Sequence, residues 1–395
     1  MRREQVKLQV ALANALMHTK GFASPETKAA VEQARLLIEQ AEARGEPPED
    51  PLLLFSVLYG GWVASYIAFN GDTLRDLARQ FLALAEKQSS TSPLMIGHRL
   101  MGTSLLSTGD AAKARSHLSQ GLALYDPAEH RFLATRFAQD LRVSILSYRS
   151  FASWSLGYPD SAANDADQVL KEGREIGHAA TLIYALWHVS VTEMFCGNYA
   201  KASVHLEEAV ALAGEKGALF WKALATVFRG CVFALAGDAS KAIQVAMSGM
   251  AMYRSTGARV FLPLCLSYLA YAYAELNKLD DASRCLNEAM TGIDATKETW
   301  HEVEVNRIAG EIALRSPQRD VAKAQSYFER ALAVARQQQA KSWELRAAMS
   351  MARLWRDQGK PQQARELLAP VYGWFTEGFD TRDLKEAKAL LDELA

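Results

Sequence analysis

Residues that could carry out catalysis or bind a metal are spread singly along this chain. The nearest approach to a metal motif is the run His-Glu-Val-Glu at 301–304, which begins like the zinc motif H-E-x-x-H but has no second histidine. None of the eight histidines has a ligand-like spacing to a cysteine or a carboxylate. Carboxylate pairs such as Glu207–Glu208 and Asp280–Asp281 fall on expected helix surfaces or turns, where the usual role is solvated charge. We therefore expect no metal site and no catalytic residue.

Phosphate chemistry has no support in the sequence either. The chain contains neither G-x-x-x-x-G-K-[ST], whose backbone N–H groups and lysine hold a triphosphate, nor the dinucleotide motif G-x-G-x-x-G. We expect no cofactor and no enzymatic activity, and in particular neither ATP hydrolysis nor cyclic-nucleotide synthesis by this chain alone. An enzyme with an unrecognised site is the hypothesis with the least support.

Charge and cysteine content exclude further classes of protein. The 44 lysines and arginines are balanced by 45 aspartates and glutamates, so the basic excess that nucleic-acid binding requires is missing. Cys196, Cys231, Cys265 and Cys285 form no C-x-x-C pair and suit a reduced compartment with buried thiols. No apolar run approaches the ~18 residues of a membrane-spanning helix. These features predict a cytoplasmic protein that binds neither nucleic acid nor membrane.

The elements that would position any site return at a fixed interval. The run CGNYAKASVHLEEAV at 196–210 is followed by similar runs about every 40 residues. A small residue recurs at one position of the runs and forms a first column: Ala114, Ala162, Ala202, Ala242, Ala282, Ala324 and Ala364. A second small column stands twelve positions earlier: Gly102, Ser150, Ser190, Gly230, Ala270 and Ala352. In the sixth unit Gly310 stands fourteen positions earlier, which implies two inserted residues. Small residues at such fixed positions predict two helices that cross closely.

Turn residues separate the two columns. Residues that tolerate positive φ stand there in six units: Gly109, Gly157, Gly197, Gly237, Asn277 and Gly359. Pro317 takes this place in the sixth unit and must form a different turn. A second glycine column follows the second helix: Gly177, Gly217 and Gly257. Each unit is therefore predicted to be a helix A, a tight turn, a helix B and another tight turn.

One helical hairpin cannot bury its apolar face alone, so the hairpins are expected to stack. We predict an all-α fold, a right-handed α-solenoid of tetratricopeptide-like hairpins with a period near 40 residues. The usual tetratricopeptide period is about 34, and a longer period also suits HEAT or armadillo repeats. The fixed small residues and turn glycines favour the tetratricopeptide pattern with longer helices. We expect degenerate helical hairpins over 1–90, tetratricopeptide-like repeats over 91–378 and a capping helix over 379–395.

The run ARQQQAKSWELRAAMSMARLWRDQGKPQQARELLAPVYGWFTEGFDTRDLKEAKALLDEL near the C-terminus resembles the tail of a bacterial signalling family. Its members join a class III adenylate/guanylate cyclase domain to an AAA-type ATPase module and a long tetratricopeptide region. TKGFASPE, LYDPAEHRF and SLGYPDSA are similar to internal landmarks of that region. The resemblance covers nearly the whole chain but only the repeat part of the family. The cyclase aspartates and the P-loop have no counterpart, so the resemblance implies a signalling role and assigns no catalytic residue.

Helix A mainly lines the concave face of such a solenoid. The positions that face this groove in tetratricopeptide proteins are aromatic in the middle of this chain and basic toward its end. We therefore single out one set for partner binding: Phe151, Trp154, Tyr184, Trp187, Tyr271, Arg307, Arg346, Arg353 and Arg356.

Each kind of residue in this set has a second, structural interpretation. The aromatic side chains could be ordinary core, since large apolar residues are usually buried, and for Trp221, Phe261 and Trp343 we expect core packing. The arginines could bind an acidic partner through their planar guanidinium groups. They could equally pair with neighbouring carboxylates such as Glu304 and Glu311.

Two functional hypotheses follow. The first is a non-catalytic scaffold or sensor that binds a protein, a peptide or a small effector in a bacterial signalling ATPase/cyclase system. The alternative is the effector-sensing solenoid arm of a transcription activator. A helix-turn-helix segment upstream would favour the second hypothesis, and upstream cyclase and P-loop motifs would favour the first.

Overall fold

The structure is a computed structural model that describes residues 2–20, 25–42, 44, 52–88, 90–316 and 319–395. The described residues form α-helices, one short 3₁₀ helix and connecting turns, and none of them lies in a strand. The prediction of an all-α solenoid of stacked hairpins is therefore confirmed. No described helix is long and apolar enough to cross a membrane.

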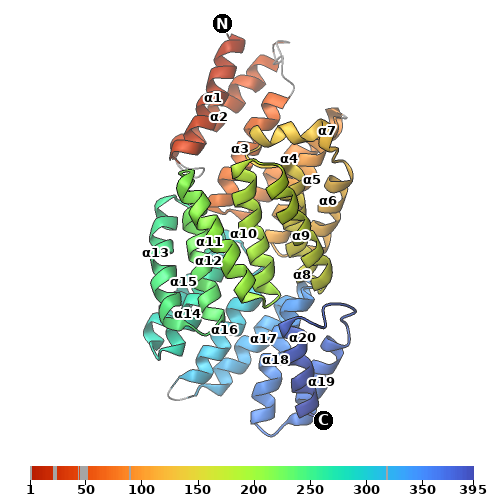
Figure 1. Ribbon diagram of the computed structural model, residues 1–395, viewed down its shortest axis with the longest axis vertical. Helices are drawn as coiled ribbons and strands as arrows, with labels where there is room; N and C mark the ends of the chain where they lie inside the picture. Colours follow the sequence, from red (N-terminus) through yellow and green to blue (C-terminus); the bar gives the residue numbers. More distant parts are fainter. Residues whose placement is uncertain (1, 21–24, 43, 45–51, 89, 317–318) are drawn as a thin grey trace.

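The helices alternate between two layers along most of the chain (Figure 1). The A helices are α3 (Leu52–Ala68), α5 (Thr91–Ser107), α8 (Leu141–Ser155), α10 (Ala179–Phe195), α12 (Leu219–Leu235), α14 (Leu262–Glu275), α16 (Glu302–Arg315) and α18 (Lys341–Asp357). The B helices are α4 (Gly71–Gln88), α6 (Ala111–Ala123), α9 (Pro159–Glu175), α11 (Tyr199–Glu215), α13 (Ala239–Ser255), α15 (Leu279–Thr296), α17 (Val321–Gln337) and α19 (Pro361–Tyr372).

The remaining helices flank or interrupt these hairpins. They are α1 (Arg2–Lys20), α2 (Pro25–Glu42), α7 (Pro127–His130), η1 (Arg131–Thr135) and α20 (Arg382–Glu393). Helix α6 ends before Asp126, which caps α7, as the Asp-Pro step at 126–127 predicts. The two chain ends lie at opposite ends of the long axis, with the α1–α2 hairpin projecting from the repeats (Figure 1). That hairpin packs around its own apolar cluster with Val6, Val10 and Ile38, separate from the main core.

The small columns lie where A and B helices cross. Every alanine of the first column is at most 1% exposed, and the Ser150 hydroxyl of the second column donates to the Ala162 carbonyl of the first at 2.8 Å. A Cβ atom on Gly230 would lie 2.5 Å from that of Ala246, sixteen positions later. The corresponding contact of Gly310 falls on Phe328, eighteen positions later, which confirms the two-residue insertion.

The turn residues have the backbone conformation that the sequence predicts. Asn277 and the glycines of both turn columns all have positive φ, as at Gly109 (+90°) and Gly177 (+71°). The second glycine column continues without glycine at Lys297 (φ +63°) and Gln339 (φ +55°), although this conformation is unfavourable for residues with a Cβ. Pro317 lies outside the described residues.

The superhelix closes on itself. Near the end of each of four A helices, a backbone carbonyl group accepts a hydrogen bond from the chain one turn later. The bonds run from Arg259 N to Ile67 O (2.8 Å), Thr299 N to Ser107 O (3.2 Å), Ser342 Oγ to Trp154 O (2.5 Å) and Arg346 Nη2 to Phe195 O (2.7 Å). We call this contact line the inter-turn seam.

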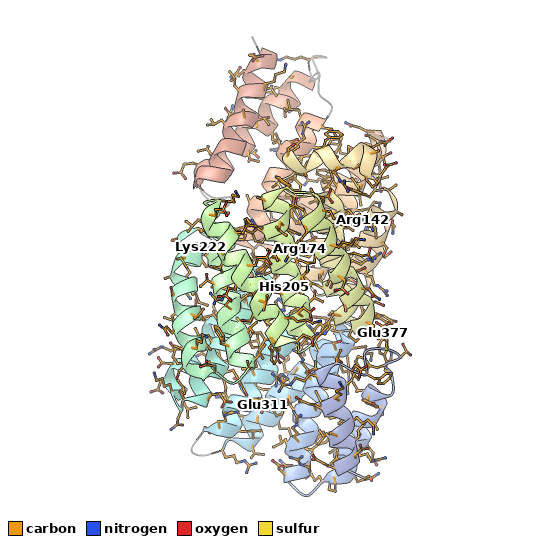
Figure 2. All side chains as sticks on the ribbon, in the orientation of Figure 1. Arg142, Arg174, His205, Lys222, Glu311 and Glu377 are labelled. Atoms are coloured by element: carbon orange, nitrogen blue, oxygen red, sulfur yellow. The ribbon has the colours of Figure 1, made fainter. Side chains whose placement is uncertain are left out.

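The seam continues toward the C-terminus on the outer layer. The Glu377 carboxylate accepts from the backbone N–H of Ser161 at 2.8 Å, at the N-terminus of α9, where a negative charge is favourable. Gly378 N donates to Asp160 Oδ2 at 2.9 Å. Figure 2 shows Glu377 between the α9 end and the C-terminal helices. The solenoid is therefore a closed coil, and its A helices surround an interior instead of an open groove.

Candidate functional site

The aromatic residues proposed for the groove are buried. Phe151 and Trp154 of α8 and Tyr184 and Trp187 of α10 are 0%, 2%, 3% and 1% exposed. The expectation that they line an open concave surface is wrong, because the next turn of the superhelix covers that surface. These four side chains are packed in the core, as the second, structural interpretation predicts.

Side chains from the second turn fill the space between the A helices. They come from the loops before α14 and α16 and from the start of α18: Phe261, Trp300, His301 and Trp343. Trp343 lies edge-on to Trp154 with ring centroids 4.7 Å apart, and Phe261 lies 4.9 Å from Trp187. Core packing is confirmed for Phe261 and Trp343, and Trp221 is partly buried against the same core. We call these interior rings, together with Tyr66, Tyr148, Phe151, Tyr184, His188 and Phe195, the axial cluster.

Two buried ionisable groups in this interior, a guanidinium and a carboxyl, have no oppositely charged partner among the described residues. Arg99 of α5 is 3% exposed, and Glu298, in the loop before α16, is 1% exposed. Arg99 donates to the Ser144 hydroxyl at 2.7 Å and to the Tyr59 hydroxyl at 3.3 Å. Glu298 Oε1 accepts from the Phe261 backbone N–H at 2.8 Å, whereas Oε2 has no hydrogen-bond partner. Isolated buried charges are costly, so these two require an explanation.

Aromatic contacts connect Arg99 to Glu298 across the seam. The Arg99 guanidinium lies over the Tyr148 ring at 5.9 Å, and the Tyr148 hydroxyl donates to the Tyr66 hydroxyl at 2.9 Å. Tyr66 packs edge-on against Phe261 at 6.4 Å. The N–H of Phe261 is the group that donates to Glu298. The Arg99 guanidinium and the Glu298 carboxyl therefore lie at the two ends of one continuous path through the axial cluster.

Unpaired polar atoms surround this path. Neither ring nitrogen of His301 has a hydrogen-bond partner in the described chain, and the same holds for His188 Nε2 and for the indole N–H groups of Trp187, Trp300 and Trp343. Buried polar atoms are normally paired. Their concentration in one interior makes the axial cluster the candidate site, because a ligand's polar groups would satisfy them.

Burial also sets the protonation of this interior. It raises the pKa of Glu298 to about 8, against the opposite influence of the Phe261 N–H and the nearby Trp300 indole. It lowers the pKa of His188 to about 3 and the pKa of His301 well below its usual value. At neutral pH both imidazoles are therefore neutral. His301 can donate one hydrogen bond and accept another, whereas His188 already donates through Nδ1 to the Tyr184 carbonyl at 2.8 Å and can only accept through Nε2.

Two of the four predicted arginines have structural partners. Arg346 lies between the rings of Trp154 and Trp343 at 5.0 and 5.1 Å and pairs with Asp383 at 2.7 Å. Arg307 donates twice to the carboxylate of Glu304, at 2.7 and 2.9 Å. The nearby carboxylates raise the pKa of both guanidinium groups against the effect of burial. Arg307 and Arg346 lie close together, since both approach Glu304.

The other predicted residues are more accessible. The side chains of Arg353 and Arg356 are 40% and 39% exposed and pair with Glu386 and Glu393 of α20 at 3.1 and 2.5 Å. Tyr271 is half-buried, with the Arg315 guanidinium 5.4 Å from its ring centroid. Their proposed role in partner binding stays a prediction. The sequence analysis did not predict that the exposed arginines of α18 form ion pairs with α20. The spacing of Glu386 and Glu393 in the last helix could have indicated these pairs.

The sequence reasoning also missed Arg99 and Glu298. Each is a single charge in an otherwise ordinary segment, and no motif surrounds it. Only the closure of the superhelix brings them into one interior. A signal was present in the run TKETWHE at 296–302, which places charged and aromatic residues side by side at a repeat boundary.

Comparisons with known proteins define the class of fold. No protein-family model matches the sequence, and no curated protein matches it. The structure is similar to a Rap protein complexed with competence and sporulation factor, with 13% identity and a TM-score of 0.62 over 99% of this chain and 100% of that one. At such identity the likeness shows the fold, a tetratricopeptide-like solenoid, over the length of the chain.

Two further solved structures share this fold. One is the Rap conjugation gene regulator of the plasmid pLS20 in complex with the Phr* peptide, with 11% identity, a TM-score of 0.53 and coverage of 99% of this chain and 96% of that one. The other is the apo form of the quorum sensor NprR from B. thuringiensis, with 10% identity, a TM-score of 0.50 and coverage of 93% and 98%. The chain thus shares its architecture with helical-repeat regulators.

Proposed function

We propose that this chain is a non-catalytic regulatory solenoid that binds a short peptide or a small effector inside its superhelix. The observation that carries the proposal is the pair of buried ionisable groups without an oppositely charged partner, Arg99 and Glu298, at the ends of the axial cluster. A ligand carboxylate would pair with Arg99, and a basic group of the ligand would take the proton that Glu298 holds at neutral pH and pair with the resulting carboxylate. The His301 imidazole and the indole N–H groups of Trp187 and Trp343, which have no hydrogen-bond partner, would bind its amide groups.

Ligand entry requires the coil to open, because side chains fill the interior. The seam hydrogen bonds and the contacts of Phe261, Trp300 and Trp343 would separate from the first turn. A ligand can shift this equilibrium only by binding one state more tightly than the other. The open and closed coils would expose different surfaces to a partner protein, which is how binding inside would be transmitted outside.

The similar structures agree with this proposal. The Rap protein of similar fold is complexed with competence and sporulation factor, the pLS20 regulator is in complex with the Phr* peptide, and NprR is a quorum sensor. We extend peptide or effector binding from these proteins to this chain by analogy of fold. The unpaired Arg99 and Glu298 side chains are an independent argument for it.

The surrounding system is the finer part of the proposal. The resemblance of the C-terminal run to cyclase–ATPase proteins favours a sensor for a signalling ATPase/cyclase system. The alternative is the sensing arm of a transcription activator. Co-purification of the native chain with an ATPase or cyclase module would support the first role, and co-purification with a DNA-binding domain would support the second.

Binding to a positional-scanning library of short peptides, read by tryptophan fluorescence, tests the interior site. We expect selected peptides to need a free carboxylate and a basic group. Arg99→Gln should weaken their binding roughly tenfold to a hundredfold, as expected for the loss of a charged hydrogen bond. Arg99→Lys should bind with intermediate affinity.

Arg79→Gln is the matched control, since Arg79 is exposed on α4 and pairs only with the nearby Asp76. Equal affinities of the Arg99→Gln and wild-type chains would overturn the assignment of the interior. ATP turnover that scales with the concentration of purified chain would overturn the non-catalytic part of the proposal.

A further inference from the structure

A cavity lies on the outside of the seam, away from the axial cluster. It has a volume of about 700 Å³, within the range of small-molecule sites. Its walls come from both turns: α6 and the α8–α9 turn on one side, and the α17–α18 turn with the residues after α19 on the other. The side chains that matter for its chemistry are Arg115, Ser116, Ser119, Tyr158, Lys341 and Trp374. We call it the seam pocket.

Two cations lie on aromatic faces in this pocket. The Arg115 guanidinium lies over the Tyr158 ring at 4.8 Å, and Lys341 Nζ lies 5.8 Å from the centre of the Trp374 ring. The rings of Tyr158 and Trp374 contact each other edge-on at 5.5 Å. The two cation–aromatic pairs therefore meet across the seam, one from each turn.

The charge in this pocket is not balanced. Lys341 pairs with Glu344 at 2.7 Å, and Glu344 also pairs with Arg336. Arg115 has no carboxylate within ion-pair distance among the described residues. Asp110, which caps the same helix, pairs with Lys113 instead, at 2.7 Å. One guanidinium group thus remains free for a single negative charge, with the hydroxyls of Ser116 and Ser119 beside it on α6.

The backbone around the pocket is tightly constrained. A Cβ atom on Gly157 (φ +89°) would lie 2.5 Å from the Trp374 ring and 2.9 Å from Lys341 Cβ. On the facing turn, Gln339 lines the pocket with a φ of +55°, a conformation that residues with a Cβ adopt at a cost. Both walls are thus held close together by the contact between the two turns.

We propose that the seam pocket binds a small aromatic carboxylate. The carboxylate would accept hydrogen bonds from Arg115, whose planar fork fits it, and from the serine hydroxyls. The ring would pack on Trp374 and Tyr158. A monoanion matches the single unpaired cation. Since the ligand would contact both turns, it would stabilise the closed coil, which gives the molecule an effector site outside its interior.

Benzoate and its uncharged counterpart benzamide are the probes, with binding measured by ligand-observed NMR and by thermal shift. We expect saturable binding of benzoate, at least tenfold weaker binding of benzamide, and a higher melting temperature with benzoate. Arg115→Gln should weaken benzoate binding tenfold or more, and Arg115→Lys less. Lys113→Gln, an exposed change on the same helix, should leave the affinity unchanged.

Three outcomes would overturn the seam pocket: no saturable benzoate binding, equal affinity for benzamide, or unchanged affinity in Arg115→Gln. A spectrum of Arg115→Gln that shows the native helix content excludes misfolding as the cause of lost binding. Benzoate binding by Arg99→Gln separates the two sites. If that variant still binds benzoate but no peptide binds the wild-type chain, the interior proposal fails and the seam pocket stands.

Discussion

Helices α10 and α11 are consecutive and both have seventeen residues, yet they differ in burial on almost every side. Thirteen residues of α10 are buried, against four of α11, which are Ala202, Leu206, Ala209 and Ala213. Helix α11 is an ordinary outer helix with one apolar stripe. Helix α10 contacts its own hairpin on one side and the axial cluster on the other.

The difference shows that closure of the coil changes the meaning of the repeat pattern. In an open solenoid the second side of an A helix would face solvent or a ligand. Here that side meets the next turn, so aromatic residues such as Trp187 on α10 become core. Polar residues on this side then need internal partners, and those without one, such as His188 Nε2, mark the candidate site.

Removing Arg346 should have the largest effect, because it connects the A helix α18 to the first turn. Arg346→Met would leave the Phe195 carbonyl and the Asp383 carboxylate without their guanidinium partner. Breaking such a buried pair typically costs about 3–5 kcal/mol of unfolding free energy. Urea denaturation measures this cost. A loss below about 1 kcal/mol would mean that the seam contributes little to stability.

Overpacking the crossing of an A and a B helix should have the next largest effect. Ala242 on the B helix α13 is 1% exposed, so Ala242→Leu should lower the unfolding free energy by about 1–3 kcal/mol. Lys241→Leu on the same helix is the control. It removes only a cation–π contact with Phe233 at 4.1 Å, worth at most about 1 kcal/mol. Equal losses would contradict the distinction between the buried and exposed sides of B helices.

The pH dependence of stability tests the unpaired carboxyl of Glu298. Its pKa in the folded chain is about 8, above its usual value of 4.5, so between these values the folded chain holds a proton that the unfolded chain has released. Stability should therefore fall as pH rises toward 8, by up to about 1.4 kcal/mol per pH unit. The histidines with lowered pKa, such as His188 and His301, oppose this slope below pH ~7.5, where the unfolded chain still holds protons on them, but this contribution is the same in the wild type and in a variant at Glu298.

Glu298→Gln is the variant for this test, since its amide oxygen can still accept from the Phe261 N–H. We expect the melting temperature of the wild type to fall relative to that of the variant as pH rises from ~6.5 to 8, because the histidine contribution is common to both chains and cancels in the difference. Parallel profiles for the two proteins would show that Glu298 is not the titrating group.

The repeat could be predicted from the sequence because its causes are local. Helix crossings need small residues, as at Gly230 against Ala246, and tight turns need residues that accept positive φ, as at Gly237. Lys297 and Gln339 take the same conformation without the favourable residue type, so no propensity rule finds them.

The candidate site could not be predicted in the same way. The seam joins residues far apart in sequence, such as Trp154 and Ser342, which are 188 positions apart. The second side of an A helix is either exposed to solvent or covered by the next turn of the superhelix. Which of the two occurs depends on the small rotation between successive hairpins, which accumulates over many repeats. The pattern at Phe151 and Trp187 is compatible with an open groove and with a closed interior, and only the three-dimensional path of the chain distinguishes them.

The smallest effect is expected at Arg353, seven residues after Arg346 on the same helix. Its side chain is 40% exposed and pairs with Glu386 of α20, an exposed arrangement that contributes at most about 1 kcal/mol. Arg353→Glu should therefore lower the melting temperature only slightly, through repulsion from Glu386, and less so at high salt. The charge swap Arg353→Glu with Glu386→Arg should restore the wild-type value. A loss of stability as large as that of Arg346→Met would instead place Arg353 in the interior, together with Arg346. A small loss combined with abolished, salt-sensitive binding of an acidic partner would assign this exposed end of α18 to recognition.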